Sequence, residues 1–152
     1  MRIVLQRVKH ANVVVDGKVV AEIGTGFLLL VGFSNRDLKN EEIKLKKIVK
    51  KIPELRIFPD NNGKFDLSLK DVKGEVLAVS QFTLYGDVKK GRRPNFQEAA
   101  PYKEAEKLFD EFIKLLTIEI PGRVKKGIFG ANMEINLCND GPVTLILDSE
   151  KM

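Results

Sequence analysis

The chain has 152 residues, of which 43% are hydrophobic and 31% charged, and its formal net charge is +5. This composition excludes intrinsic disorder, and the length suits a single domain over residues 1–152. No apolar run approaches the roughly 20 residues of a membrane span, and the one cysteine, Cys138, excludes an intrachain disulfide. We therefore expect a cytoplasmic protein with no membrane partner.

Four strands are predicted in the first third of the chain, and two of them form a hairpin. Residues 2–9 alternate between apolar and polar side chains, as a strand does. β-branched runs then flank Asp16-Gly17 within 12–24, which is a strong hairpin signal. The continuous apolar run 26–33 is typical of a strand buried on both faces.

Two helices are predicted from apolar residues at helical spacing. The first begins after Asn40 as N-cap, has Glu41 and Glu42 in its first turn, and ends at Pro53. Its buried face comprises Leu45, Ile48, Val49 and Ile52. The second begins near Pro101, and its buried face comprises Tyr102, Ala105, Phe109, Phe112 and Leu116.

The remaining apolar runs predict strands. Residues 55–69 indicate two short strands around an Asp-Asn-Asn-Gly turn, and 75–85 indicate one longer strand. Strands are also expected around 117–120, 133–139 and 143–147. The fold class is thus α/β, with a mostly antiparallel sheet and two long helices.

Gly141 and Pro142 interrupt what otherwise looks like one C-terminal strand. Proline donates no ladder hydrogen bond and belongs at strand edges, strand starts or turns, while glycine permits almost any backbone angle. One interpretation is a hairpin turn between two strands. The other is a backbone device that binds something, and the local pattern leaves both open.

The chain is poor in the side chains of common active sites. His10 is its only histidine, so it holds neither a zinc cluster nor a Cys–His dyad, and it has no Gly-rich phosphate loop. We expect no metal and no cofactor. In a strand, Gln81 and Thr83 share one face and place an amide beside a hydroxyl. The alternative is a strand that simply leaves the core for solvent.

Basic residues gather in two short segments. Lys89, Lys90, Arg92 and Arg93 surround a glycine, and a second group lies within 121–127. Both segments look like loops, and two such loops would suit contact with a phosphate backbone. The alternative is ordinary solvated surface charge.

Read together, the motifs "SQFTLYGD" at 80–87 and "NDGPVT" at 139–144 resemble the two signature motifs of the D-aminoacyl-tRNA deacylase family. Further similar segments, in the family's order and spacing, are "QRV" at 6–8, "LRIFPD" at 55–60, "GRRPNF" at 91–96 and "FGANM" at 129–133. The resemblance covers the whole chain. One departure is Asn132, where many members are expected to carry an acidic residue.

The resemblance implies a barrel-like sheet and a homodimeric hydrolase that cleaves the ester between a D-amino acid and tRNA. Ser80, Gln81 and Thr83 would be catalytic and Phe82 substrate-binding. Gly141 and Pro142, joined by a cis peptide bond, would complete the pocket of the other subunit, and Arg7 would support them. The Gly-Pro carbonyls would exclude an L side chain, so glycyl-tRNA is an expected substrate as well. Thr83 is expected to act without becoming acylated, because no general base is in view.

Two other functions remain open on the sequence. One is an RNA-binding module without chemistry, based on the basic segments, although only 7% of the residues are aromatic. The other is a purely structural dimer in which Gly-Pro is an interface turn. Both predict that the protein releases no D-amino acid from charged tRNA.

Overall fold

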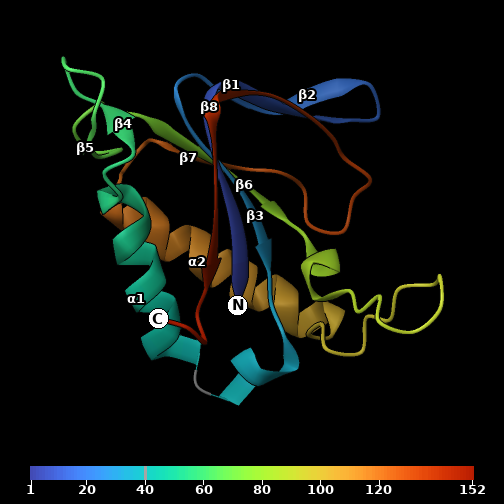
Figure 1. Ribbon diagram of the computed structural model, residues 1–152. Coiled ribbons are helices and arrows are strands. Elements are labelled where there is room, and N and C mark those ends of the chain that lie inside the picture. The colour runs from blue at the N-terminus through green and yellow to red at the C-terminus, as the bar shows by residue number, and fades with distance from the viewer. Residues whose placement is uncertain (40) are drawn as a thin grey trace.

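The computed structural model describes residues 1–39 and 41–152, and its centre is a long strand, β1 (Arg2–Val15) (Figure 1). β8 (Glu134–Asp148) runs antiparallel along one side of β1. On the other side, β3 (Gly26–Gly32) pairs with the first half of β1 and β2 (Lys18–Ile23) with the second half. The hairpin predicted around Asp16-Gly17 is therefore confirmed.

Two parallel pairings complete this sheet. β6 (Glu75–Ser80) lies parallel to β3, and β7 (Val124–Lys126) lies parallel to β6. A separate two-stranded unit, β4 (Phe58–Pro59) and β5 (Phe65–Leu67), forms the short hairpin expected in 55–69. The sheet is mixed and barrel-like, and most of its pairings are antiparallel, which confirms the predicted fold class.

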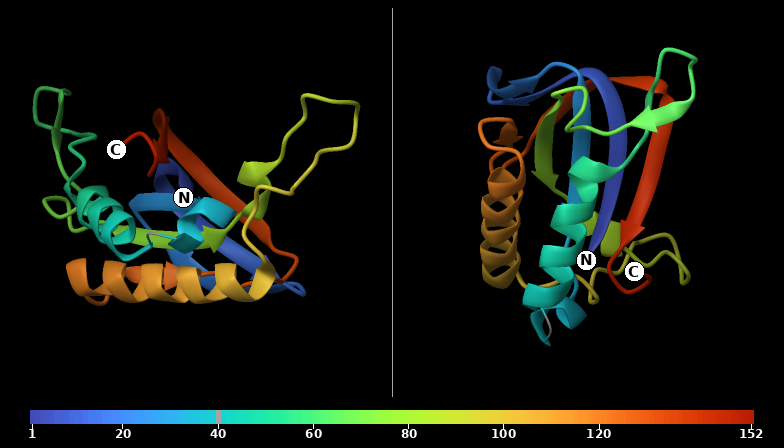
Figure 2. Two further views of the ribbon diagram at one scale, coloured as in Figure 1. Left: turned by 90° about the horizontal axis from the view of Figure 1, so that it is seen from below. Right: turned by 90° about the vertical axis from the view of Figure 1, so that its left-hand side faces the viewer.

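Helices α1 (Glu41–Lys51) and α2 (Tyr102–Glu119) lie next to each other against the sheet (Figure 2). The predicted N-cap, Asn40, lies outside the described residues, as do the side chains of Glu41 and Glu42. The predicted buried face of α1 is confirmed. Pro53 follows in a 3-10 turn, η2 (Ile52–Glu54).

Two hydrophobic clusters explain why β3 is apolar throughout. Phe27, Leu29 and Val31 point toward the helices and join the larger cluster. Leu28 points the opposite way, into a smaller cluster enclosed by the curled sheet, together with Val13 and Leu77. Successive side chains of a strand face opposite sides, so β3 is buried on both faces, as the sequence predicts.

Two of the expected strands are wrong in extent or type. The strand predicted over 75–85 ends at Ser80, and a 3-10 turn, η3 (Phe82–Tyr85), replaces its second half. The strand predicted around 117–120 is the last turn of α2 and its C-cap. There the helical period prevails, because Ile120 is fully buried four residues after Leu116 while Ile118 is 65% exposed.

The Gly-Pro pair does not form a hairpin turn, so that interpretation of the sequence is wrong. Val8 of β1 faces Asn139, and Gln6 faces Thr144, so β8 continues in one direction past both. Between these two pairings lie one residue of β1, Arg7, and four residues of β8, 140–143. The extra residues of β8 form a bulge. Gly141 and Pro142 lie in this bulge.

Candidate active site

The segment 80–83 forms the junction between β6 and η3. The Gln81 amide Nε2 donates a hydrogen bond to Thr83 Oγ1. The amide and hydroxyl thus lie together as expected, but a turn brings them there rather than one face of a strand. Phe82 and Thr83 are exposed, and Ser80 and Gln81 are half-buried.

A pocket of about 530 Å³ adjoins this turn. Ser80, Gln81 and Phe82 line it from the carboxyl end of β6. The opposite wall is apolar and comes from the start of α2 and from residues 129–135, including Tyr102, Phe129 and Met133. Edge-to-face packing, with ring centroids 5.1 Å apart, holds Tyr102 against Phe129.

The sequence does not predict all the residues of this wall. Tyr102 was expected on the buried face of α2 but is 60% exposed, because it stands at the mouth of the pocket rather than in the core. The only sequence feature that points to the segment 129–133 is its resemblance to a family segment. Nothing in its spacing indicates that it faces residues 80–82, some fifty positions earlier.

The backbone of η3 presents two donors at its start. The first hydrogen bond of the turn runs from Leu84 N–H to the Gln81 carbonyl, at 3.3 Å. The Phe82 and Thr83 N–H groups precede this bond, and no backbone acceptor for them exists in residues 1–39 and 41–152. They are therefore available to a ligand.

The Gly141–Pro142 bulge is exposed, and its peptide bond is cis, as expected. Arg7, which is 5% exposed, lies against it. Its Nε donates to the Asp140 carbonyl at 3.0 Å, and its Nη1 donates to the Ile57 carbonyl at 2.5 Å. Gly141 has φ +136°, and a Cβ there would lie 3.0 Å from the backbone nitrogen of Val143, so only glycine fits without strain.

The two motifs lie apart within one chain. Ser80 pairs with Val31, which pairs with Ile3 near the start of β1, whereas the bulge lies beside Arg7. Four residues of β1 correspond to about 13 Å along the strand. The motifs also lie on opposite sides of β1, since β8 pairs with one edge and β3 with the other. The bulge does not line the pocket of its own chain.

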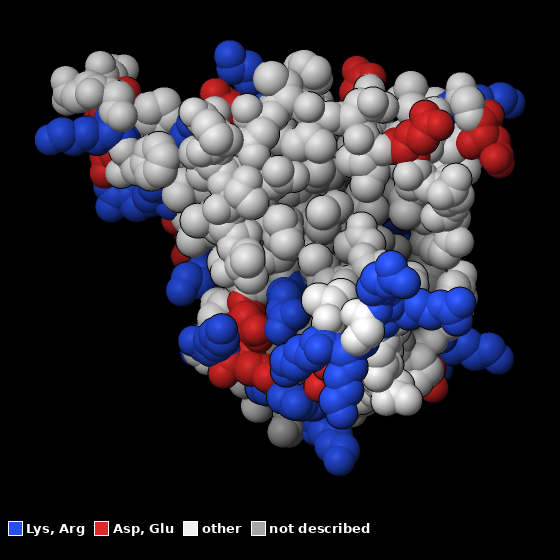
Figure 3. Space-filling model, turned by 45° about the vertical axis from the view of Figure 1, so that its right-hand side comes forward, with Lys and Arg blue, Asp and Glu red and all other residues white. Residues whose placement is uncertain are grey.

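The two basic segments differ. Lys89, Lys90, Arg92 and Arg93 are exposed on the protruding loop 86–98 (Figure 2), and Lys and Arg side chains gather in the lower part of the face in Figure 3. None of the four side chains has an ion pair or hydrogen bond within the described part of the chain. In the second segment, Lys125 and Lys126 lie in strand β7 rather than in a loop, and Arg123 directly precedes it.

The cations of this second segment are already paired. Arg123 donates to the Gly74 carbonyl, Lys125 to the Glu22 carbonyl, and Lys126 to the Asp110 carboxylate. They therefore have less capacity for an external phosphate than the cations of the loop 86–98.

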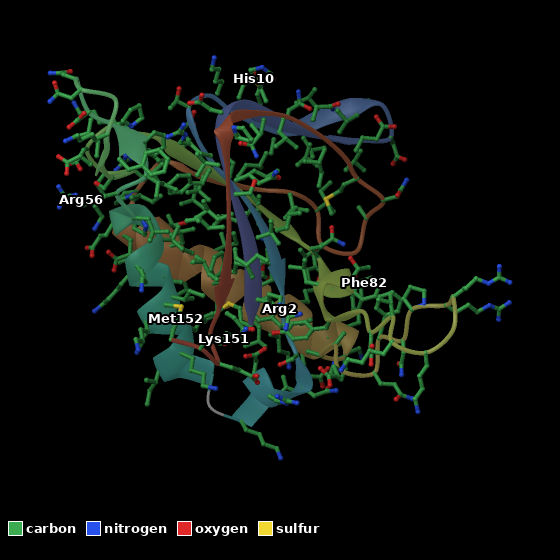
Figure 4. All side chains as sticks on the ribbon, viewed as in Figure 1. Arg2, His10, Arg56, Phe82, Lys151 and Met152 are labelled. Atoms are coloured by element: carbon green, nitrogen blue, oxygen red, sulfur yellow. The ribbon has the colours of Figure 1, made fainter. Side chains whose placement is uncertain are left out.

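Figure 4 places His10 at the far end of the sheet from Phe82, so the only histidine of the chain is remote from the turn. In residues 1–39 and 41–152, no group of three His, Cys, Asp or Glu side chains is arranged to hold a metal ion. No helix in the same residues is long and apolar enough to cross a membrane.

Solved structures share this architecture. One titled c-Myc DNA Unwinding Element Binding Protein matches with a TM-score of 0.89 and 41% identity, over 97% of this chain and 98% of that one. Another, a probable eukaryotic D-amino acid tRNA deacylase, matches with a TM-score of 0.83 and 22% identity, over 96% and 97% of the two chains. The fold is that of the D-amino acid tRNA deacylases.

Sequence comparison narrows this class. The family model described as D-Tyr-tRNA(Tyr) deacylase matches residues 4–148. A D-aminoacyl-tRNA deacylase of Clostridium beijerinckii is 52% identical over 151 residues, 99% of both chains. One of Thermosipho africanus is 51% identical over 152 residues, 100% of this chain and 99% of that protein. The chain belongs to the D-Tyr-tRNA(Tyr) deacylase family.

Proposed function

We propose that this protein hydrolyses the ester bond of D-aminoacyl-tRNA and releases the D-amino acid and tRNA. Family membership supports the reaction class. The observation that carries the proposal is the apolar pocket beside η3, whose first two N–H groups have no backbone acceptor in the described residues. An aminoacylated terminal nucleoside is a ligand that a pocket of about 530 Å³ would accommodate.

In the proposed mechanism, water attacks the carbonyl carbon of the ester. The carbonyl oxygen lies against the Phe82 and Thr83 N–H groups. These donors stabilise the oxyanion of the tetrahedral intermediate. The bond to the ribose oxygen then breaks, and this oxygen takes the electron pair and a proton that the attacking water releases. Ser80 and Gln81 orient the aminoacyl end, and Phe82 covers it.

Thr83 acts without becoming acylated. Its Oγ1 accepts from the Gln81 amide, which is not a base, and no carboxylate or imidazole contacts the hydroxyl in the described part of the chain. A threonine nucleophile needs such a neighbour to remove its proton. Positioning and backbone donors suffice for an ester, which is already activated.

We further propose that Gly141 and Pro142 of a second copy complete the pocket and exclude L side chains. The distance between the motifs within one chain supports this arrangement, as does the exposure of the bulge. β8 also exposes an apolar side chain for association, since Ile146 is 70% exposed. The homodimer is thus the proposed active form, with Arg7 holding the bulge from beneath.

The acceptor arm of tRNA would lie against the loop 86–98. The base of this loop is anchored at η3, where the Phe96 ring packs against Phe82 with centroids 5.1 Å apart, and its four uncompensated cations project from there. Phosphates bound there would guide the charged end toward the pocket. Charged tRNA is a substrate of translation, so the cytoplasm is the proposed place of action.

A hydrolysis assay distinguishes this function from nucleic-acid binding alone. One structural neighbour is named as a DNA-binding protein. Purified protein is incubated with D-tyrosyl- and L-tyrosyl-tRNA, and the remaining ester is measured over time. We expect rapid loss of the D ester and persistence of the L ester. If the protein binds tRNA but does not accelerate loss of the ester, the proposed hydrolase function is wrong. The alternatives are then an RNA-binding module or a structural dimer.

A further inference from the structure

Arg2 contacts the turn η3 in two ways. Its Nη1 donates a hydrogen bond of 2.7 Å to the Leu84 carbonyl. Its Cζ lies 4.9 Å from the ring centroid of Tyr85, within the range of a cation–π interaction. The labelled Arg2 in Figure 4 lies on the side of the molecule where Phe82 and the turn are found. Its Nη2 also lies 3.6 Å from the Asp148 carboxylate.

Tyr85 is in turn buried beside a polar network. The ring is 9% exposed, and Ser34 and Asp37 both lie close to its hydroxyl. Burial, reinforced by the Asp37 carboxylate, raises the pKa of Tyr85 to about 12, so the phenol stays neutral. Ser34 donates to Asp37 from both its backbone N–H, at 2.7 Å, and its Oγ, at 2.8 Å.

The turn depends on such external contacts. It contains four residues, and the backbone bonds at its two ends join Leu84 N–H to the Gln81 carbonyl and Gly86 N–H to the Thr83 carbonyl. A single turn is not stable by itself, because its few bonds do not offset the cost of ordering the chain. The direction of the Phe82 and Thr83 N–H groups is therefore set by whatever holds Leu84 and Tyr85.

We propose that Arg2 is a positioning residue for the hydrolysis, because it fixes the turn whose N–H groups receive the ester oxygen. This inference rests on the proposed function. Arg2 and Arg7 then have parallel tasks on one strand: Arg2 holds the Ser80–Thr83 motif through the Leu84 carbonyl, and Arg7 holds the Gly-Pro bulge through the Asp140 carbonyl.

A guanidinium suits this task better than an ammonium. Its planar group lies over the Tyr85 ring while separate N–H donors reach Leu84 and approach Asp148. A lysine places one compact charge at the end of a flexible stem and cannot make these contacts together. Replacement by lysine keeps the charge but releases the turn.

The test compares kcat and KM for D-tyrosyl-tRNA in the Arg2→Met and Arg2→Lys variants. Displacement of a catalytic group by about 1 Å costs about 10²-fold in rate, so we expect kcat of Arg2→Met to fall by about that factor. KM should stay near the wild-type value, because Arg2 does not line the pocket. Arg2→Lys should recover only a minor part of the loss.

Two matched variants serve as controls. Arg36→Met removes an exposed arginine that forms an ion pair with Glu150. Asp148→Asn removes the acidic neighbour of Arg2 but leaves the bond to Leu84. Both should retain the wild-type kcat. Melting temperatures establish that each variant is folded, and Arg2→Lys decides the matter if Arg2→Met does not fold.

The outcomes are distinct. A wild-type protein that releases no D-tyrosine overturns the proposed function itself. An active wild type with unchanged kcat in folded Arg2 variants overturns only the positioning role. A rise in KM with unchanged kcat would mean that Arg2 binds tRNA instead, and an equal loss in Asp148→Asn would assign the effect to the ion pair; both also overturn the inference.

Discussion

Thr83 is the residue at which the mechanism is most exposed to test. Its hydroxyl has the Gln81 amide as neighbour, while the two backbone donors of the turn belong to the main chain and survive any substitution of the side chain. We expect Thr83→Ala to lower the deacylation rate without reducing it to the uncatalysed rate. Single-turnover hydrolysis of D-tyrosyl-tRNA measures this. Complete loss in a folded, tRNA-binding variant, or a trapped acyl-threonine, would instead make Thr83 the nucleophile.

Asp37 predicts how acid affects stability. Burial opposes ionisation of this carboxyl, but hydrogen bonds from the Met1 ammonium and Ser34 outweigh it and hold its pKa below the ordinary 3.8. A lowered carboxyl pKa stabilises the fold above the unfolded value, and this stabilisation is lost as pH falls through the folded value. We therefore expect the Asp37 contribution to be complete at pH 7 and to decline as pH falls below about 4.

Asp37→Asn isolates that contribution. The substitution leaves the buried Met1 ammonium without its carboxylate and should cost about 1–3 kcal/mol at pH 7. Urea unfolding of the untagged protein at several pH values measures the difference from wild type. The two curves should converge in acid; a constant difference down to pH 3 would show that Asp37 is not the titrating group.

At the scale of elements, the sequence predicts secondary structure where a long periodic segment determines it. It does not predict secondary structure that depends on contacts with distant residues. The fully apolar β3 and the amphipathic α1 and α2 follow from their own side chains. Residues 81–85 have β-forming side chains, yet they turn, because the contacts of Arg2 and the burial of Tyr85 hold them. Arg2 is distant in sequence from this turn, so no local pattern could reveal it.

The C-terminal strand shows the same limit for the site. Proline after glycine predicts a break, and a break exists, but the partner strand determines its form. β1 pairs with residues on both sides of the bulge, so the chain continues instead of reversing. The motifs at 80–83 and 141–142 were recognisable as sequence, whereas the separation between them became apparent only from strand order.

The loop 86–98 provides the prediction at this scale. Replacing Lys89, Lys90, Arg92 and Arg93 by Gln should weaken tRNA binding and flatten its salt dependence, since each lost phosphate contact lowers the log–log slope by roughly 0.7–0.9. Binding is measured between low and moderate salt. A matched variant replaces Lys125 and Lys126, which already have protein partners, and should keep the wild-type slope. If the two variants have equal slopes, the loop cations do not contact tRNA phosphates and are ordinary solvated surface charge.

At the scale of the whole molecule, the proposed site needs two copies of the chain, and its selectivity comes from exclusion. Gly141 and Pro142 of the partner would occupy the space where an L side chain projects, while a D side chain points elsewhere. Glycine has no side chain to collide with anything, so exclusion cannot reject it. We therefore expect the protein to cleave glycyl-tRNA as well as D-aminoacyl-tRNA.

Positive contacts with the D side chain do not change this expectation. Apolar contact with a small missing group discriminates by only about 1–3 kcal/mol, or roughly 10–200-fold. An enzyme that accepts many D side chains holds each of them loosely, which keeps the difference at the lower end. Glycyl-, D-alanyl- and L-alanyl-tRNA are compared at equal enzyme concentration. Glycyl-tRNA should be cleaved far faster than L-alanyl-tRNA; if it is equally resistant, the enzyme reads the D side chain directly, and the bulge does not select by exclusion.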